Sequence, residues 1–217
     1  MPTRRSRSHA AAPTLVLLVR HGQTATTGKV LPGRAPGLHL ADTGVAQAEA
    51  MAKRLGELPR VDAIYASPME RTKETAAPIA RERAMKVTLD KALLECDFGE
   101  WTGRPLKELA KEPAWATVQR YPSGFRFPGG ESFVEMQTRM TGTLHLLGER
   151  HPAGVVVVVS HADPIKAAVA DALGTHLDLF QRINISPCSV TAVHYGPGGP
   201  AVLAVNSVEP LSALVPS

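Results

Sequence analysis

Two unbroken aliphatic runs, at residues 15–19 and 155–159, constrain the fold of this chain most strongly. The first reads Leu-Val-Leu-Leu-Val, and the second is five consecutive valines. Short runs that are apolar throughout are typical of strands covered on both faces, as in a parallel sheet beneath layers of helices. The sequence therefore predicts buried strands at residues 14–19 and 154–160.

Further strand patterns occur between and after these runs. We expect strands at residues 61–66 and 86–90. Two more, at residues 189–195 and 201–206, flank a Gly- and Pro-rich turn and give a hairpin signal.

Helical patterns alternate with the strands. Apolar residues recur at helical spacing over residues 45–58. Ser67 is expected to cap the next helix, which Pro78 should kink or shorten. A long helix is expected over residues 131–150, and a last one is expected to begin at Asp163 as its N-cap. This alternation predicts an α/β fold, a three-layer α/β/α sandwich, in which ligands bind beyond the carboxyl ends of the strands.

Composition and charge narrow the classes of function. The chain has 217 residues, a length compatible with one domain, and a formal net charge of +4. Three of those charges belong to arginines in the first seven residues, so residues 1–13 are expected to be a disordered basic tail. The remainder is nearly neutral, which gives little support for nucleic-acid binding.

The apolar patterning and the cysteines bear on location. The run at residues 15–19 is too short for a secretion signal, and no stretch approaches the roughly 20 apolar residues of a membrane helix. Two cysteines make no disulfide framework. We therefore predict a cytoplasmic protein with no membrane partner.

Four polar segments carry the candidate chemistry. Arg20-His21-Gly22-Gln23-Thr24 follows the first strand, Ser67 to Thr72 follows the strand at 61–66, Glu95 follows Leu93-Leu94, and Ser160-His161-Ala162 closes the polyvaline strand. Together they resemble the histidine phosphatase superfamily, also called phosphoglycerate mutase-like, across residues 14–206. Segments 33–37 and 160–166 look like an actinobacterial-type phosphatase branch of that family.

The resemblance implies a fold and an activity. The implied fold is a mixed, mostly parallel six-stranded sheet with helices on both faces and one antiparallel strand near the end. The implied activity is hydrolysis of a phosphomonoester without a metal or other cofactor. His21 would be the nucleophile and become transiently phosphorylated, Arg20, Arg71 and His161 would bind the phosphate, and Glu95 would be the proton donor.

Each of these residue types suits its role. A neutral imidazole has a lone pair for attack on phosphorus, and a guanidinium group can grip phosphate oxygens as a planar fork. A carboxyl group can protonate the leaving oxygen and later deprotonate the attacking water. Asp97 and Glu100 lie close to Glu95 in the sequence, and they stay open as alternatives for that role.

A second set of residues is expected near the phosphate or the rest of the substrate. Gly22 would let the backbone turn sharply and bring amide groups near the phosphate. The others are Gln23, Thr24, Thr27, Arg34 and Ala162. Two positions depart from the family's pattern: Thr27 stands where many relatives have asparagine, and Asp163 stands where many have glycine.

Residues 112–130 are expected to form a lid-like insertion that sets substrate choice. Arg120 and Arg126 within it could meet a second anionic group or be solvated loop arginines. We therefore predict a small phosphorylated metabolite as the substrate. A phosphoglycerate mutase and a non-catalytic phosphate-binding regulatory protein are the alternatives. Residues 207–217 are expected to form a C-terminal tail, and a homodimer stays open.

Overall fold

A computed structural model describes residues 12–208 of the chain. The tails predicted at residues 1–13 and 207–217 lie outside the described residues, except for residues 12–13 and 207–208. No helix within residues 12–208 has the length and apolar character needed to cross a bilayer.

One six-stranded sheet organises the molecule, in the order β3-β2-β4-β1-β5-β6. β1, β4, β2 and β3 pair in parallel, whereas β5 is antiparallel to both β1 and β6. This confirms a mixed, mostly parallel sheet with one antiparallel strand near the end. The strands are β1 (Thr14–Arg20), β2 (Ala63–Ala66), β3 (Val87–Leu89), β4 (Val155–Ser160), β5 (Val190–Gly196) and β6 (Gly199–Ser207).

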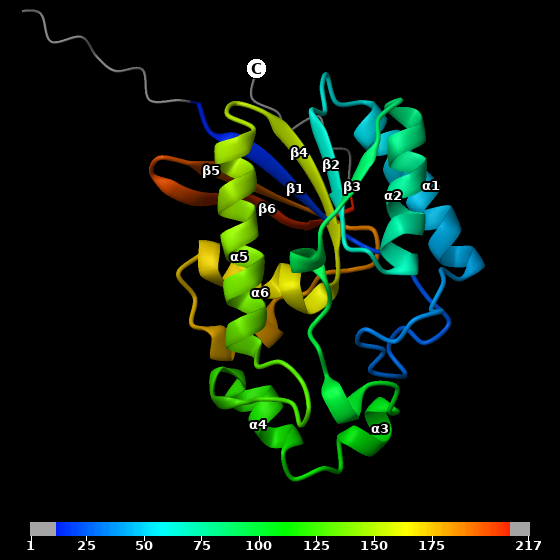
Figure 1. Ribbon diagram of the computed structural model, residues 1–217, viewed down its shortest axis with the longest axis vertical. Coiled ribbons are helices and arrows are strands. Elements are labelled where there is room, and N and C mark those ends of the chain that lie inside the picture. The colour runs from blue at the N-terminus through cyan, green and yellow to red at the C-terminus, as the bar shows by residue number, and fades with distance from the viewer. Residues whose placement is uncertain (1–11, 209–217) are drawn as a thin grey trace, which may run out of the picture.

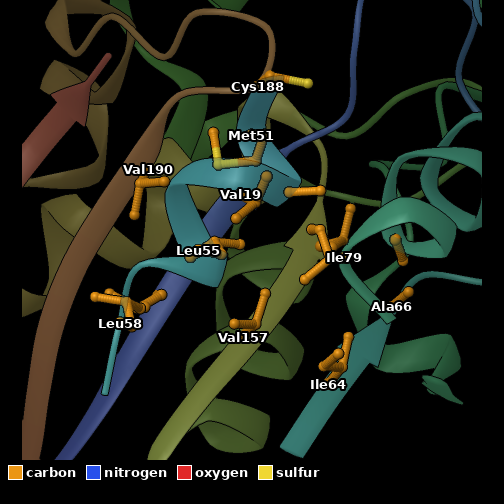
Figure 2. Packing of buried hydrophobic residues seen from close by; sticks show 14 of the residues in the cluster. Val19, Met51, Leu55, Leu58, Ile64, Ala66, Ile79, Val157, Cys188 and Val190 are labelled. Atoms are coloured by element: carbon orange, nitrogen blue, oxygen red, sulfur yellow. The ribbon is translucent and has the colours of Figure 1, made fainter. Parts of the chain in front are cut away.

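Helices cover both faces of this sheet (Figure 1). Four helices do so: α1 (Asp42–Gly56), α2 (Glu70–Glu82), α5 (Phe133–Arg150) and α6 (Ala162–Ala172). Side chains of β1 and β4 alternate between the two faces, because successive residues of a strand point to opposite sides. The odd-numbered side chains of both strands pack with α1 and α2, as Figure 2 shows for Val19, Val157, Met51, Leu55 and Ile79. The even-numbered ones pack with α5 and α6. The predicted three-layer sandwich is therefore confirmed.

Short helical segments gather at one end of the sheet, below it in Figure 1. They include α3 (Leu106–Leu109), α4 (Trp115–Arg120) and 3-10 turns at Lys91–Leu93, Gly99–Trp101, Pro122–Gly124 and Leu177–Arg182. An aromatic cluster holds this end together. Phe127 is 1% exposed and its ring lies 4.9 Å from that of Phe98, 5.5 Å from Trp101 and 5.2 Å from Phe133.

Two predicted helix caps are wrong. α2 begins at Glu70, after Met69, and the Ser67 hydroxyl instead contacts His161 Nε2 at 2.8 Å. α6 begins at Ala162, directly after β4, so the N-cap position falls on His161 and Asp163 is the second helical residue. At Ser67, the hydrogen bond to His161 replaces a capping bond. At α6, the helix begins directly after β4, before Asp163 can take the N-cap position. α2 also continues four residues past Pro78, so Pro78 does not end the helix, and a kink there stays a prediction.

Candidate active site

Parallel pairing of β1 and β4 places two histidines side by side. Arg20 is in register with Ser160, and each strand is followed at once by a histidine. The backbone N–H of His21 donates to the carbonyl of Ser160 at 3.0 Å. Both imidazoles are buried, and their ring centroids lie 5.2 Å apart at an interplanar angle of 66°.

Hydrogen bonds determine the tautomer of His21. Its Nδ1 lies 2.8 Å from the carbonyl oxygen of Gly22. A carbonyl only accepts, so Nδ1 carries the ring proton and Nε2 keeps its lone pair. Burial first, and then the charge of Arg71, lower the pKa of His21 to about 3. His21 is therefore a neutral imidazole at physiological pH.

Arg71 and Arg20 bring guanidinium groups to this imidazole. Arg71 is completely buried; its Nε donates to His21 Nε2 at 3.3 Å and one terminal nitrogen donates to the Gly33 carbonyl at 2.8 Å. Arg20 donates to the carbonyl of Ile185 at 2.6 Å. Arg20 Nε and the second terminal nitrogen of Arg71 have no hydrogen-bond partner within residues 12–208.

These unpaired N–H groups indicate an anion site. Within the described part of the chain, neither arginine forms an ion pair with a carboxylate. Buried charges in proteins are normally paired. The buried guanidinium group of Arg71 and the half-buried one of Arg20, beside a neutral imidazole, can therefore accept a dianion such as a phosphate group.

His161 offers a third donor. Its Nε2 contacts the Ser67 hydroxyl at 2.8 Å, whereas its buried Nδ1 has no partner within residues 12–208. Burial, followed by the charge of Arg71, holds the pKa of His161 well below its ordinary value. The ring is thus neutral without a ligand. If the Ser67 hydroxyl donates to Nε2, the ring proton lies on Nδ1 and can be donated to an anion.

Glu95 follows the 3-10 turn after β3 and borders the same region. It is 7% exposed, and its Oε1 accepts a hydrogen bond from the backbone N–H of Cys96 at 2.9 Å. Burial first, and then the negative charge of Asp163, raise the pKa of Glu95 to about 7. The two alternative carboxylates lie elsewhere: Asp97 contacts Arg34 and Gly99, and Glu100 is exposed.

The loop after His21 is held by its own hydrogen bonds. The N–H of Gly22 donates to Thr75 Oγ1 of α2 at 3.0 Å. This amide, which the sequence predicts near the phosphate, is therefore already hydrogen-bonded within the protein. The N–H of Gln23 donates to Gln47 at 2.9 Å. Thr27 Oγ1 accepts from the N–H of Thr24 at 2.9 Å, so it closes a turn within the loop.

Arg34 forms hydrogen bonds that hold the backbone at Glu95 in place. Its Nε donates to the Glu95 backbone carbonyl at 2.8 Å, and its terminal nitrogens reach Asp97 at 3.4 Å and Glu131 at 3.0 Å. Arg139 donates to the same Glu95 carbonyl at 3.0 Å. Arg34 therefore acts on the position of Glu95 and has its own charge compensated by carboxylates.

A cavity of about 290 Å³ opens beside Arg20 and Glu95. Ala162 lines it, as do Trp115, Val118 and Gln119 of the predicted lid segment. The two lid arginines do not: Arg120 is exposed, and Arg126 is exposed and paired with Glu135. A role for these two in binding a second anion stays a prediction without geometric support.

Three polar residues of this cavity were missed as ligand-binding candidates: Lys166, Gln119 and Gln181. Lys166 could have been found, because it lies on the helix that follows His161 and one turn beyond Asp163. Gln119 lies in the predicted lid segment, but neutral side chains there gave no signal. Gln181 comes from a 3-10 turn far along the chain, and no local pattern indicates that it would reach this cavity.

Comparisons with known proteins agree with this geometry. The chain is 30% identical over 204 residues to phosphoserine phosphatase 1 of Hydrogenobacter thermophilus, covering 88% of this chain and 91% of that protein. It is 32% identical over 183 residues to a protein of Cronobacter sakazakii named probable phosphoglycerate mutase, covering 83% and 84%. Among solved structures, phosphoserine phosphatase of Entamoeba histolytica in complex with 3-phosphoglyceric acid superposes with a TM-score of 0.81 at 25% identity, covering 91% of this chain and 99% of that one. The model of the histidine phosphatase superfamily, branch 1, matches residues 16–208, and the chain belongs to that superfamily.

Proposed function

We propose that this protein is a metal-independent phosphomonoester hydrolase that acts on a small phosphorylated metabolite through a phosphohistidine on His21. One observation carries the proposal. His21 is a neutral imidazole whose Nε2 lone pair accepts a hydrogen bond from Arg71, and it lies buried against guanidinium groups that have no acidic partner in the described chain. A neutral imidazole is a nucleophile, and the unpaired guanidinium groups supply the charge that a phosphate dianion needs.

In the first half-reaction, Nε2 of His21 forms a bond to phosphorus while the bond from phosphorus to the ester oxygen breaks. Arg20, Arg71 and the Nδ1–H of His161 donate to the peripheral phosphate oxygens, whose charge must be stabilised in the transition state. Glu95 gives its proton to the departing oxygen, so the alcohol leaves uncharged. Its pKa of about 7 keeps that proton available near neutral pH.

In the second half-reaction, a water molecule attacks the phosphorus of the phosphohistidine. The ionised Glu95 takes one proton from that water, and the phosphorus–nitrogen bond breaks with its electron pair returning to Nε2. Inorganic phosphate leaves, and Glu95 is protonated again. A raised pKa suits this double role, because both protonation states are accessible near neutral pH.

The relatives favour small phosphorylated acids as substrates. One is named phosphoserine phosphatase, and one solved relative is a complex with 3-phosphoglyceric acid. A phosphoglycerate mutase is the second candidate, because another relative is named as one. A mutase would use the same His21 but return the phosphoryl group to a substrate alcohol. Release of inorganic phosphate from 3-phosphoglycerate, measured against formation of its isomer, separates the two.

His21→Ala tests the mechanism. We expect turnover of p-nitrophenyl phosphate to be abolished and the circular dichroism spectrum to be unchanged, because only the nucleophile is removed. His39→Ala is the matched control, since His39 lies at the surface and pairs with Glu74. Retention of more than a few per cent of the wild-type rate by His21→Ala would overturn the nucleophile assignment. Absence of turnover in the wild type on a panel of phosphorylated metabolites would favour a non-catalytic phosphate-binding protein.

A cytoplasmic location also belongs to this proposal. Cys96 and Cys188 are both buried and unpaired, as is usual in a reducing compartment. Fractionation of the source cells tests it, and recovery outside the cytoplasmic fraction would contradict it. The oligomeric state is testable by sedimentation.

A further inference from the structure

The substrate cavity is lined by both polar and apolar side chains. Eight of its sixteen lining residues have apolar side chains larger than alanine: Leu31, Pro32, Phe98, Leu106, Trp115, Val118, Phe127 and Phe133. Asp163 and Lys166 of α6 line the cavity together with Gln181. Gln119 is the remaining polar residue away from the Arg20–Glu95 edge. A substrate held by its phosphate at Arg20 would therefore meet charge mainly at α6.

Lys166 is held in place by two neighbours. Its Nζ donates to Asp163 Oδ1 at 3.2 Å and to Gln181 Oε1 at 3.2 Å. Its side chain and that of Asp163 are 17% and 16% exposed. An ammonium group has three N–H donors, and these contacts use two. One donor of Lys166 therefore remains for a ligand.

The ammonium group of Lys166 lies near the phosphate end of α6. Side chains of a helix lean toward its N-terminus, and the bond to Asp163, three residues earlier, shows that Lys166 does so. The residue at the N-cap of this helix is His161, whose buried Nδ1 has no hydrogen-bond partner within residues 12–208. A group only a few bonds from the phosphoester oxygen could thus reach Lys166.

No other cation of the described chain competes for this role within the cavity. Arg20 and Lys166 are the two cationic residues that line it. Arg34 and Arg126 do not line the cavity. Lys166 has a single carboxylate, Asp163, and a neutral amide as hydrogen-bond partners, and its Nζ lies 6.0 Å from the centroid of the Phe180 ring.

We propose that Lys166 is the specificity-determining residue of this enzyme and binds a carboxylate that the substrate carries close to its phosphoester. This inference rests on the proposed function. Asp163 and Gln181 are positioning residues that hold the ammonium group toward the cavity. The role explains a carboxylate so near a phosphate site, because Asp163 pairs with the ammonium group of Lys166 and holds it in position. A charge-assisted hydrogen bond is strong enough to select between substrates.

Matched substrates test this inference. Phosphoserine and phosphoethanolamine differ only by a carboxylate, and 3-phosphoglycerate and glycerol 3-phosphate differ by a carboxylate in place of a hydroxymethyl group. We expect the wild type to prefer the carboxylate member of each pair. Lys166→Met should lower kcat/KM for the two carboxylates about tenfold or more, as for the loss of a hydrogen bond to a charged group. For the other two substrates and for p-nitrophenyl phosphate, kcat/KM should fall by a smaller factor, because these substrates lose no contact with Lys166.

Lys107→Met is the control variant, since Lys107 is exposed on α3 beside the cavity-lining Leu106. It should leave all five rates unchanged. An equal fall for every substrate in Lys166→Met, or no carboxylate preference in the wild type, overturns the proposal. Lys166→Gln provides a second variant if the Lys166→Met protein does not fold.

A binding measurement keeps this test separate from the proposed function. Calorimetric titration of the His21→Ala variant measures its affinity for phosphoserine and for phosphoethanolamine without turnover. The ratio of the two affinities reports the preference for a carboxylate. We expect tighter binding of phosphoserine, and loss of that difference in His21→Ala/Lys166→Met. Equal affinity for both ligands contradicts the role of Lys166 even if the enzyme hydrolyses both, whereas failure of turnover alone contradicts only the phosphatase mechanism.

Discussion

At the scale of single residues, burial controls which groups around His21 are charged. His21 and His161 have lowered pKa values and Glu95 has a raised one, so burial favours the neutral form of all three. Arg20 and Arg71 also have lowered pKa values because of burial, yet a guanidinium group stays protonated in proteins. Positive charge for the phosphate is therefore supplied by groups that do not titrate near neutral pH. Glu95 is the group of this set with a pKa near 7.

Replacing Glu95 with Gln should separate the two half-reactions. Nitrophenolate leaves without a proton, so phosphorylation of His21 by p-nitrophenyl phosphate should survive, while alkyl phosphates react far more slowly. Hydrolysis of the phosphohistidine should slow because its base is gone. Rapid mixing should show a burst of about one nitrophenolate per site and an acid-labile phosphoenzyme. If the rate of phosphorylation falls equally with alkyl phosphates and with p-nitrophenyl phosphate, and no phosphoenzyme accumulates, Glu95 is not the acid–base residue.

Asp163→Asn should shift the pH dependence. The negative charge of Asp163 raises the pKa of Glu95, against the lowering effect of Arg71 and Arg20. Without that charge Glu95 loses its proton at lower pH, so the alkaline limb of kcat/KM for glycerol 3-phosphate should move to lower pH. This substrate has no carboxylate, which keeps the measurement independent of Lys166. The alkaline limb of kcat/KM for p-nitrophenyl phosphate should not move, because nitrophenolate leaves without a proton from Glu95. An unmoved limb for glycerol 3-phosphate would show that Asp163 does not act on Glu95.

Residue types and their order predicted which side chains lie at the site, but not all of their partners. His21, His161 and Arg71 follow strand ends, and strand ends meet at one edge of a parallel sheet, so their proximity followed from the sequence. The contacts of Arg34 with Glu131 and of Ser67 with His161 join segments far apart in the chain. Local propensity contains no information about such contacts, which is why the cap predicted at Ser67 failed.

At the scale of elements, apolar patterning predicted every strand of the sheet within a few residues. Strongly buried strands such as β1 and β4 are the clearest, because both faces need apolar side chains. Helix starts were less predictable. β4 turns directly into α6, so the helix begins one residue before the expected cap at Asp163.

Packing of the first loop against α1 predicts the effect of a small substitution. A Cβ added at Gly22 would lie 2.6 Å from the backbone oxygen of Gly44. Gly22→Ala should therefore destabilise the fold by about 1–3 kcal/mol, because backbone must move to relieve the overlap. Gly142→Ala is the control: it lies within α5 with nothing near its Cβ position, and it should stabilise by up to about 1 kcal/mol. Urea denaturation measures both, and equal stability of the two variants would contradict the close approach.

At the scale of the whole molecule, several elements contribute charge to one point. Arg20 ends β1, Arg71 lies in the first turn of α2, and His161 precedes α6. Within residues 12–208, no group of three or more His, Cys, Asp or Glu side chains is arranged to hold a metal ion. The donor groups of Arg20, Arg71 and His161 can together stabilise the charge on a phosphoryl group.

Chelation should accordingly leave activity unchanged. We expect the rate with p-nitrophenyl phosphate to be the same before and after dialysis against EDTA, because guanidinium groups provide the charge that a divalent ion would supply. Orthovanadate should inhibit competitively by occupying the same donors. Loss of activity in EDTA that a divalent ion restores would contradict this mechanism.

The pairing of β1 with β4 also bears on how the protein folds. His21 and His161 are separated by more than half of the chain, and their approach depends on a parallel ladder that closes this long loop. Contacts of such high sequence separation form slowly, because chain entropy is lost before they are made. Recovery of phosphatase activity during refolding should therefore lag behind recovery of helical signal. A nascent chain that ends before β4 would contain His21 and Arg71 but lack His161, so it should remain inert until β4 and the residue after it have been synthesised.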